Sequence, residues 1–449
     1  MSRAANPAQA TVVVLNTCTV TAGADHDARA AIRRVRRQNP DAKIVVTGCY
    51  AQRAPEEILA IPGVSLVVGN SHKHKLAEIA LAGQQEVQSH GSSFVPLAGL
   101  TENRELRTEN SVFVSDIFAH TELLAAPVFD AANERTRPNL KVQDGCDNRC
   151  SFCVIPFVRG QSRSLEMERI LREINTLVDS GYREVVISGI NLGRWGRDLP
   201  ARTQRPTTSD QRLVALIRAI LTETNLEKLR ISSVEPMDWS DELISLVASS
   251  PRIAKHAHVP MQSGSDAVLR RMHRKYRPWH YRAKIEKIRA AIPDAAIGAD
   301  VMVGFPGETD AEFEATRKMI EELPFTYLHV FTYSPRPGTP AASMKNQVPV
   351  HLARERNRIL RELAAEKKLT FMRSFIGKTV EAITLNVTGS DADGEFTEAL
   401  TGNYLKLRLR GHHEANVWMH SAIQAVRDGV LSGELVRNSA EVRFLVLSS

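Results

Sequence analysis

The sequence predicts an α/β protein, and three observations support this fold class. Short apolar, β-branched runs alternate with amphipathic helical stretches through most of the 449 residues, which is the pattern of parallel βαβ units. From Asn139 onward six such units follow one another, which suits a partial (βα)6 barrel. Beyond Phe371 short β-type runs dominate, which predicts a small C-terminal β-barrel.

Three apolar runs in the N-terminal region predict a doubly wound parallel sheet, with helices from Ala24 to Arg37 and from about Pro55. Cys18 and Cys49 directly follow the first two runs, so we expect both at one rim of this sheet. The sequence enters on a buried-type strand, so we expect this domain to lack its first βα unit. The runs are Thr11–Leu15, Lys43–Thr47 and Val64–Val68.

The periodicity divides the chain into four segments. We expect an N-terminal domain at 1–84, a linker at 85–138, a barrel domain at 139–370 and a β domain at 371–449. An edge element is expected in the linker at Val112–Phe118, and a charged helix at His351–Lys368. The expected strands of the last two domains are Leu140–Gln143, Glu184–Ser188, Lys228–Ser232, His256–Val259, Ala296–Val303, Tyr327–Tyr333, Thr379–Leu385, Tyr404–Leu409 and Val442–Leu447.

Composition excludes several classes of protein. Hydrophobic content of 43% with 24% charged residues is globular, and no apolar run approaches the roughly 20 residues of a membrane span. The first residues contain no apolar signal core, so we expect a cytoplasmic protein that contacts no membrane. The net charge of +7 permits a polyanionic partner. Five cysteines, an odd and clustered set, favour metal or redox chemistry over disulfides.

Three of the cysteines lie within eight residues, in Cys146-Asp-Asn-Arg-Cys150-Ser-Phe-Cys153, directly after the first expected barrel strand. Three thiolates on one loop can bind three irons of a 4Fe-4S cluster and leave the fourth iron for another ligand. The alternative is a zinc knot, but structural zinc requires four ligands, and no nearby Cys or His supplies the fourth. We therefore predict an iron-sulfur cluster held by Cys146, Cys150 and Cys153.

This Cys-x3-Cys-x2-Cys loop after the first strand of an α/β barrel resembles the signature of radical S-adenosylmethionine (SAM) enzymes. Longer motifs resemble the methylthiotransferases among them. Met272–Tyr276 and Leu328–Phe331 most resemble the branch that acts on N6-threonylcarbamoyladenosine in tRNA. The resemblance runs from about Thr11 to the C-terminus. Its longer motifs are Leu140–Cys146, Cys153–Gly160, Pro260–Ser265, Asp300–Thr309 and Tyr333–Ala341.

The resemblance implies a mechanism and a set of cofactor contacts. In the family, the open iron chelates SAM, a radical removes hydrogen from C2 of the adenine, sulfur is inserted there, and a second SAM supplies the methyl group. For most of the implied SAM contacts, ordinary loop packing, a salt bridge or a tight turn is the alternative role. The implied contacts are Phe152, Gly189, Glu235, Gln262, Ser263 and Gly304.

By the same resemblance, Cys18 and Cys49 match two of three cysteine motifs that bind a second, auxiliary 4Fe-4S cluster. The third ligand, on a Gly-Cys-x-x-Asn loop, is absent from this sequence. A start codon assigned too late, a natural truncation and a different fourth-ligand arrangement each explain that absence. The alternative is a pair of buried structural thiols.

Two basic regions predict contacts with RNA. Arg270–Lys284 interleaves basic and aromatic residues, with Arg274 and Lys275 at its centre, although a solvated helix face is the alternative. The C-terminal segment resembles the TRAM domain, a small RNA-binding barrel. Within it Lys406, Arg408 and Arg410 alternate along one strand and therefore share one face.

These observations favour a tRNA methylthiotransferase that acts on N6-threonylcarbamoyladenosine at position 37, with the anticodon stem-loop as partner. A flavodoxin or ferredoxin would donate the electron. The alternatives are isopentenyladenosine tRNA or a ribosomal protein as substrate, or a decayed homologue that binds RNA without modifying it. Iron and sulfide counting separates the enzyme from the non-catalytic alternative, because about eight irons per chain indicate two clusters and about four indicate one. Mass analysis of tRNA nucleosides separates the substrates.

Overall fold

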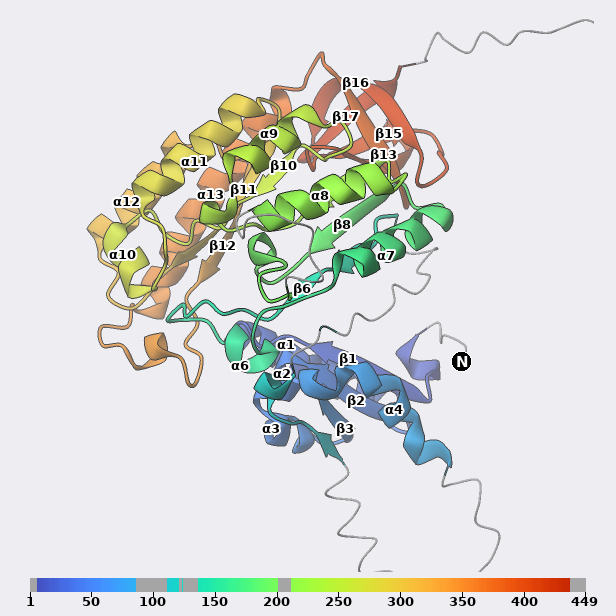
Figure 1. Ribbon diagram of the computed structural model, residues 1–449, viewed down its shortest axis with the longest axis vertical. Helices are drawn as coiled ribbons and strands as arrows, with labels where there is room; N and C mark the ends of the chain where they lie inside the picture. Colours follow the sequence, from blue (N-terminus) through green and yellow to red (C-terminus); the bar gives the residue numbers. More distant parts are fainter. Residues whose placement is uncertain (1–5, 86–110, 121–122, 124–135, 201–210, 437–449) are drawn as a thin grey trace, which may run out of the picture.

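The computed structural model describes residues 6–85, 111–120, 123, 136–200 and 211–436. Figure 1 shows an N-terminal domain, a central layer of strands covered by helices, and a C-terminal β domain at the opposite end from the N-terminal domain. The predicted α/β class and its three parts are confirmed. Within these ranges no helix combines the length and the apolar character that crossing a membrane requires.

The N-terminal domain is a parallel sheet in the order β1-β2-β3-β4. The first two strands pair from Val12↔Lys43 to Thr17↔Gly48, so their carboxyl ends are level. The predicted edge element is β4, which pairs with β3 in parallel. The elements are β1 (Val12–Thr17), α1 (Ala22–Gln38), β2 (Lys43–Gly48), α2 (Cys49–Arg53), α3 (Pro55–Leu59), β3 (Val64–Gly69), α4 (Leu76–Gln85) and β4 (Val112–Phe113).

Six parallel strands form the central domain, in chain order. Sheets β5-β8-β9 and β10-β11-β12 are joined by the parallel bridge Ser233↔His258, so they continue one another around an open barrel. The core between the strands and the helices is aliphatic, with Ile187, Leu216 and Val301 fully buried. The strands are β5 (Asn139–Lys141), β8 (Glu184–Ser188), β9 (Lys228–Ile231), β10 (His256–His258), β11 (Ala296–Val303) and β12 (Tyr327–Thr332).

Helices between these strands present an apolar face to the sheet, as α7 does with Ile170 and Ile174. A short antiparallel pair, β6 (Gln143–Asp144) with β7 (Arg163–Ser164), brackets the three-cysteine loop. The helices are α6 (Ile155–Arg159), α7 (Met167–Asp179), α8 (Arg212–Glu223), α9 (Asp241–Ser249), α10 (Asp266–Arg271), α11 (Pro278–Ala291), α12 (Asp310–Glu322) and α13 (Val350–Arg373).

The C-terminal domain is a closed barrel with the strand order β13-β14-β15-β17-β16. Leu407, Leu409 and Leu431 fill its core. The predicted strand at Val442–Leu447 lies outside the described residues, and β14, β16 and β17 were not predicted. The strands are β13 (Thr379–Asp391), β14 (Gly394–Thr401), β15 (Lys406–Arg410), β16 (Trp418–Arg427) and β17 (Val430–Leu435).

Candidate functional site

The three-cysteine loop lies at the carboxyl end of the first barrel strands, between β6 and α6. All three thiols are free and partly exposed. The Asn148 backbone N–H donates to Cys146 Sγ at 3.4 Å, and Arg274 donates to Cys150 Sγ at 3.3 Å. The loop is anchored to the rest of the barrel because the Ser151 hydroxyl donates to the Arg271 carbonyl at 2.7 Å.

The chemistry of this donor set fits an iron-sulfur cluster. Each iron of a cluster takes one thiolate, and hydrogen bonds to the sulfurs tune its potential. Burial raises the pKa of Cys146, and it raises the pKa of Cys153 to about 12, so both thiols need a cationic partner in order to ionise. Among the described residues, no group of three or more His, Cys, Asp or Glu side chains is placed to hold one metal ion.

Arg274 lies beside this loop. Its side chain is 6% exposed, and it forms an ion pair with Glu235, which follows β9. Cys150 Sγ accepts from the same guanidinium, so one cation serves both a carboxylate and a thiol. The prediction that Arg274 contacts RNA phosphates does not fit this burial. The salt-bridged role considered for Glu235 is the one observed.

The two N-terminal cysteines face the same region. Cys18 and Cys49 follow the paired residues Thr17 and Gly48, as expected for neighbouring parallel strands. Cys18 is exposed, whereas Cys49 is buried. Cys49 packs on Val154 and Val158, which follow the three-cysteine loop directly.

Arg159, at the end of α6, connects the two cysteine sets. Its Nε donates to Cys49 Sγ at 3.1 Å, and its Nη1 lies 3.3 Å from a carboxylate oxygen of Asp144. Burial alone would raise the pKa of Asp144, but Arg159 and Lys141 outweigh it and hold that pKa below its usual value. The N-terminal rim therefore faces the barrel rim across a charged contact. No sequence pattern predicts this contact, because Cys49 and Arg159 are 110 residues apart.

The predicted SAM contact Gly189 is packed closely against the buried side chain of Gln143. A Cβ at Gly189 would come within 2.8 Å of Gln143 Oε1, so glycine is required there. Gln143 accepts from the Asn191 N–H at 2.7 Å and donates to the Gly145 carbonyl at 2.8 Å. This buried amide sets the shape of the strand ends around the cysteine loop, and it was not predicted as a site residue.

The turns after β10 and β11 hold the next predicted contacts. Gln262 has a φ of +61°, and its N–H donates to the Asp300 carbonyl at 2.8 Å. Ser263 is buried and lies 3.1 Å from the Thr316 hydroxyl. Phe152 meets Phe305 edge to face with ring centroids 6.4 Å apart, as in ordinary packing. Their roles toward SAM stay predictions.

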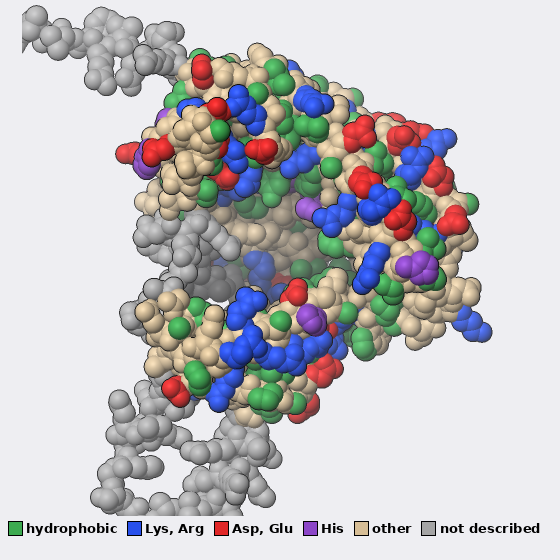
Figure 2. All heavy atoms as spheres, turned by 180° about the vertical axis from the view of Figure 1, so that it is seen from behind, with side chains coloured by type: hydrophobic (Ala, Val, Ile, Leu, Met, Phe, Trp, Pro, Cys, Tyr) green, Lys and Arg blue, Asp and Glu red, His purple; other side chains and the backbone are tan. Residues whose placement is uncertain are grey.

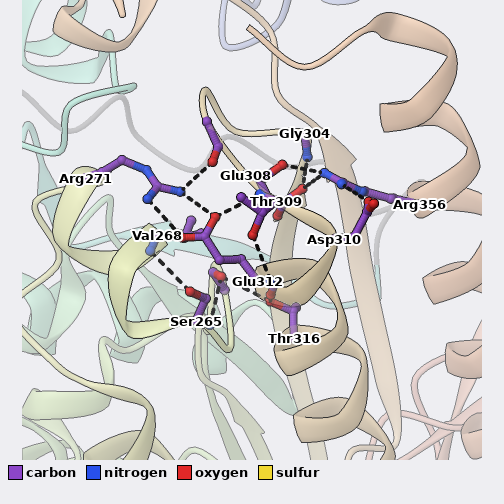
Figure 3. Close-up of polar contacts among 12 residues, drawn as sticks. Ser265, Val268, Arg271, Gly304, Glu308, Thr309, Asp310, Glu312, Thr316 and Arg356 are labelled. Atoms are coloured by element: carbon purple, nitrogen blue, oxygen red, sulfur yellow. Dashed lines mark hydrogen bonds and ion pairs between the residues drawn. The ribbon is translucent and has the colours of Figure 1, made fainter. Parts of the chain in front are cut away.

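Gly304 begins a turn that Figure 3 shows in detail. It has a φ of +75°, and a Cβ there would lie 2.6 Å from that of Ala353. Its N–H donates to Glu308 at 2.7 Å, and Glu308 pairs with Arg356 at 2.8 Å. Arg356 of α13 therefore holds this turn in place through Glu308. A contact between Gly304 and the adenine of SAM stays a prediction.

The predicted RNA-binding residues of the β domain lie on one face. Leu407 and Leu409 point into the core, which leaves Lys406, Arg408 and Arg410 outside. Each is paired with an acidic side chain: Lys406 with Glu398 at 3.1 Å, Arg408 with Asp391 at 3.4 Å, and Arg410 with Asp391 at 2.6 Å. Lys275, in the other basic region, is exposed.

The chain matches two families. Residues 140–320 match the Radical SAM superfamily, and residues 1–69 match Uncharacterized protein family UPF0004. A likeness in fold, at 17% identity and a TM-score of 0.50, extends to a radical SAM methyltransferase from Kitasatospora setae, TsrM, over 74% of this chain and 64% of that one. The barrel and its three-cysteine loop therefore define a radical SAM enzyme.

Two relatives in sequence narrow the class. The threonylcarbamoyladenosine tRNA methylthiotransferase MtaB of Bacillus subtilis is 38% identical over 90% of this chain and 82% of its own length. The tRNA-2-methylthio-N(6)-dimethylallyladenosine synthase of Endomicrobium trichonymphae is 31% identical over 92% and 88%. The chain belongs to the radical SAM methylthiotransferases, which confirms the predicted family and enzyme class.

Proposed function

We propose that the chain attaches a methylthio group to C2 of N6-threonylcarbamoyladenosine at position 37 of tRNA, next to the anticodon. The observation that carries this proposal is the contact between the two cysteine sets. Cys49 packs directly on the segment that follows Cys153, and Arg159 bridges the two rims. Sulfur insertion requires a radical site and a sulfur-delivering site to be close together, and this contact supplies that arrangement.

Cys146, Cys150 and Cys153 would hold the radical SAM cluster. A bound cluster and SAM supply one-electron cleavage of SAM and the radical that removes hydrogen from the adenine. The chain's own residues position these groups, with Arg274 between Glu235 and Cys150 as a fixed cation. Phe152, Gly189, Glu235, Gln262, Ser263 and Gly304 lie at or after the ends of the barrel strands or within the cysteine loop, which supports their assignment to SAM.

Cys18 and Cys49 would bind the auxiliary cluster. Their positions after level, paired strand ends support this assignment. The Arg159 guanidinium beside Cys49 Sγ would stabilise a thiolate there. A flavodoxin or ferredoxin in the cytoplasm would supply the electron.

The tRNA partner is supported by the distribution of charge. Figure 2 shows the molecule hollowed between its two ends, with Lys and Arg side chains gathered along the edge formed by the N-terminal domain. An RNA stem-loop carries dense negative charge, which such an edge attracts. Lys275, Lys406, Arg408 and Arg410 are proposed as further contacts to RNA.

Mass analysis of tRNA nucleosides from cells that lack the gene tests the substrate. We expect loss of the 2-methylthio derivative of N6-threonylcarbamoyladenosine and accumulation of its precursor. Loss of the isopentenyladenosine derivative, or of a methylthio group on a ribosomal protein, would show a different substrate. Unchanged nucleosides, with about four irons per reconstituted chain, would indicate a decayed enzyme.

A further inference from the structure

A cavity of about 640 Å³ lies inside the barrel, where the β domain covers it. Its wall is formed by β9, β10 and β12 and is completed by β13 and Tyr404 of the β domain. Ser233 lies in this wall, and Glu235, two residues further on, lines the small hollow beside Cys150. The segment after β9 therefore borders two hollows, one at the β domain and one at the cysteine loop. The volume of the cavity is typical of a ligand site.

The wall of the cavity is basic. Its lining residues in the described part of the chain include Arg137, Arg230 and three histidines, and none is Asp or Glu. A carboxylate oxygen of Asp300 lies 3.4 Å from the lining residue His258. Behind the wall Glu184, fully buried, accepts from Arg230 Nε at 2.6 Å, and Arg137 Nη1 lies 3.9 Å from the same oxygen. Two guanidinium groups thus share the Glu184 carboxylate, and Arg137 is the one held at the longer distance.

Arg137 is the less constrained of the two cations. Arg230 is 3% exposed and also donates to the Gly402 carbonyl at 3.2 Å, so its position is fixed between the barrel and the β domain. The Arg137 side chain is 23% exposed and borders the cavity. Burial lowers the pKa of Arg137, which means that an additional anion would stabilise its charged form.

Aromatic rings line the same end of the cavity. Tyr404 lies 5.0 Å from His256 and 5.9 Å from Tyr327, measured between ring centroids, and His256 Nε2 lies 2.7 Å from the Tyr327 hydroxyl. Tyr404 is 46% exposed and its backbone has a φ of +67°, so a turn of the β domain holds this ring at the barrel. Such rings suit a planar group conjugated to a nucleobase.

We propose, on the basis of the tRNA function proposed above, that Arg137 pairs with the carboxylate of the threonylcarbamoyl group on the substrate adenine, with Tyr404 closing the same subsite from the β domain. The threonyl group carries the carboxylate and hydroxyl that this wall complements. An isopentenyl group carries neither, so it leaves Arg137 without an additional anion and the subsite discriminates against it. Arg137 is thereby a specificity-determining residue, and the β domain takes part in reading the base.

Two anticodon stem-loop RNAs test this inference, one with N6-threonylcarbamoyladenosine and one with its methyl ester, which lacks the negative charge. We expect the chain to bind and convert the acid about 10- to 100-fold better than the ester, the range of one charge-assisted pair. Arg137→Ala should lower the binding and conversion of the acid RNA to the level of the ester RNA. The binding and conversion of the ester RNA should stay the same. Arg137→Lys should restore part of the preference.

Arg218→Ala is the matched control, because Arg218 pairs with Glu242 at 3.0 Å on the helix surface, away from the cavity wall. It should keep the full preference for the acid. SAM cleavage without RNA should be the same in all variants. The inference is wrong if Arg137→Ala binds and converts the acid RNA better than the ester RNA by the same factor as the unmodified chain. If the unmodified chain converts neither RNA and binds neither, the proposed function itself fails.

Discussion

The barrel meets its two neighbouring domains through junctions that both contain a buried arginine but balance its charge differently. At the N-terminal junction Arg336, 3% exposed, pairs with Asp25 of α1, so cation and anion belong to different domains. At the C-terminal junction Arg230 is balanced by Glu184 of the barrel itself. The β domain contributes only neutral carbonyls to it, those of Thr401 and Gly402.

This difference shows which junction depends on a buried charge pair. An N-terminal domain that separates leaves Arg336 without its anion, which is expensive for a buried charge. A β domain that separates leaves the pair of Arg230 and Glu184 intact and breaks the more exposed pair of Lys228 with Glu381 at 2.8 Å. The junction that brings the two cysteine sets together is thus the one whose ion pair is buried on both sides.

The largest expected effect distinguishes the cysteines on the two sides of the N-terminal junction, Cys150 in the barrel and Cys49 in the N-terminal domain. Cys150→Ala should abolish formation of 5′-deoxyadenosine, because the radical SAM cluster loses one of its three protein ligands. Cys49→Ala should leave that cleavage intact and stop sulfur insertion. Chromatography of SAM cleavage products and mass analysis of the RNA measure the two steps. Cleavage that persists in Cys150→Ala would contradict the assignment of the loop.

Asp25→Ala tests the N-terminal junction, where the ion pair is buried. Removal of the carboxylate leaves Arg336 buried without an ion-pair partner. It also removes the ion pair between Asp25 and Arg53, which lie 3.1 Å apart. We therefore expect a loss of about 3–5 kcal/mol in the free energy of unfolding. Chemical denaturation measures it. Asp27→Ala, on the same helix with a side chain 86% exposed, is the control and should change stability by less than about 0.5 kcal/mol. Equal effects of the two substitutions would refute the distinction.

Glu184→Gln tests the other junction. The amide keeps a hydrogen-bond acceptor for Arg230 but removes the balancing charge, so we expect a smaller loss, about 1.5–3 kcal/mol. The same denaturation experiment measures it. Glu242→Gln, which changes an exposed pair with Arg218, should cost no more than about 1 kcal/mol. A loss larger than that of Asp25→Ala would reverse the ranking of the two junctions.

His256, beside the C-terminal junction, predicts a dependence on pH. Burial, reinforced by the charge of Arg230, lowers the pKa of His256 to about 3. Between pH 6.5 and this value the unfolded chain binds a proton that the folded chain does not. The free energy of unfolding therefore falls as the pH is lowered, by up to about 1.4 kcal/mol per pH unit. His256→Gln should reduce the loss of stability between pH 7 and pH 5 by about 2 kcal/mol. An unchanged slope would show that His256 is not the group responsible.

The smallest effect concerns the outer face of the β domain. Lys406→Ala should weaken RNA binding only a few-fold and lower the salt dependence of binding by about one unit of slope. Glu398, 3.1 Å away, already neutralises part of this charge. Titration at several salt concentrations measures the slope. Lys367→Ala on α13 is the control, and an equal change in both variants would remove Lys406 from the RNA surface.

The strands could be predicted because their signal is local. β8 and β11 begin and end where the sequence predicts, and the parallel pairing places Cys18, Cys49 and the three-cysteine loop at strand ends. The β domain was less predictable, since β14, β16 and β17 alternate short apolar and polar residues without a sustained run. The periodicity of apolar residues and the content of β-branched residues indicate which face of one element is buried. They do not indicate which elements pack against it.

Sequence alone determined the α/β class, the order of the domains and the three-cysteine loop, because these depend on residues close together in the chain. Tertiary structure alone decided that Arg274 is buried beside Cys150, that Arg159 joins the two cysteine sets, and that Arg137, from the expected linker, borders the cavity. Ion pairs and cavity walls join residues separated by tens to hundreds of positions. Their geometry follows from how the packed layers meet, which no local pattern encodes.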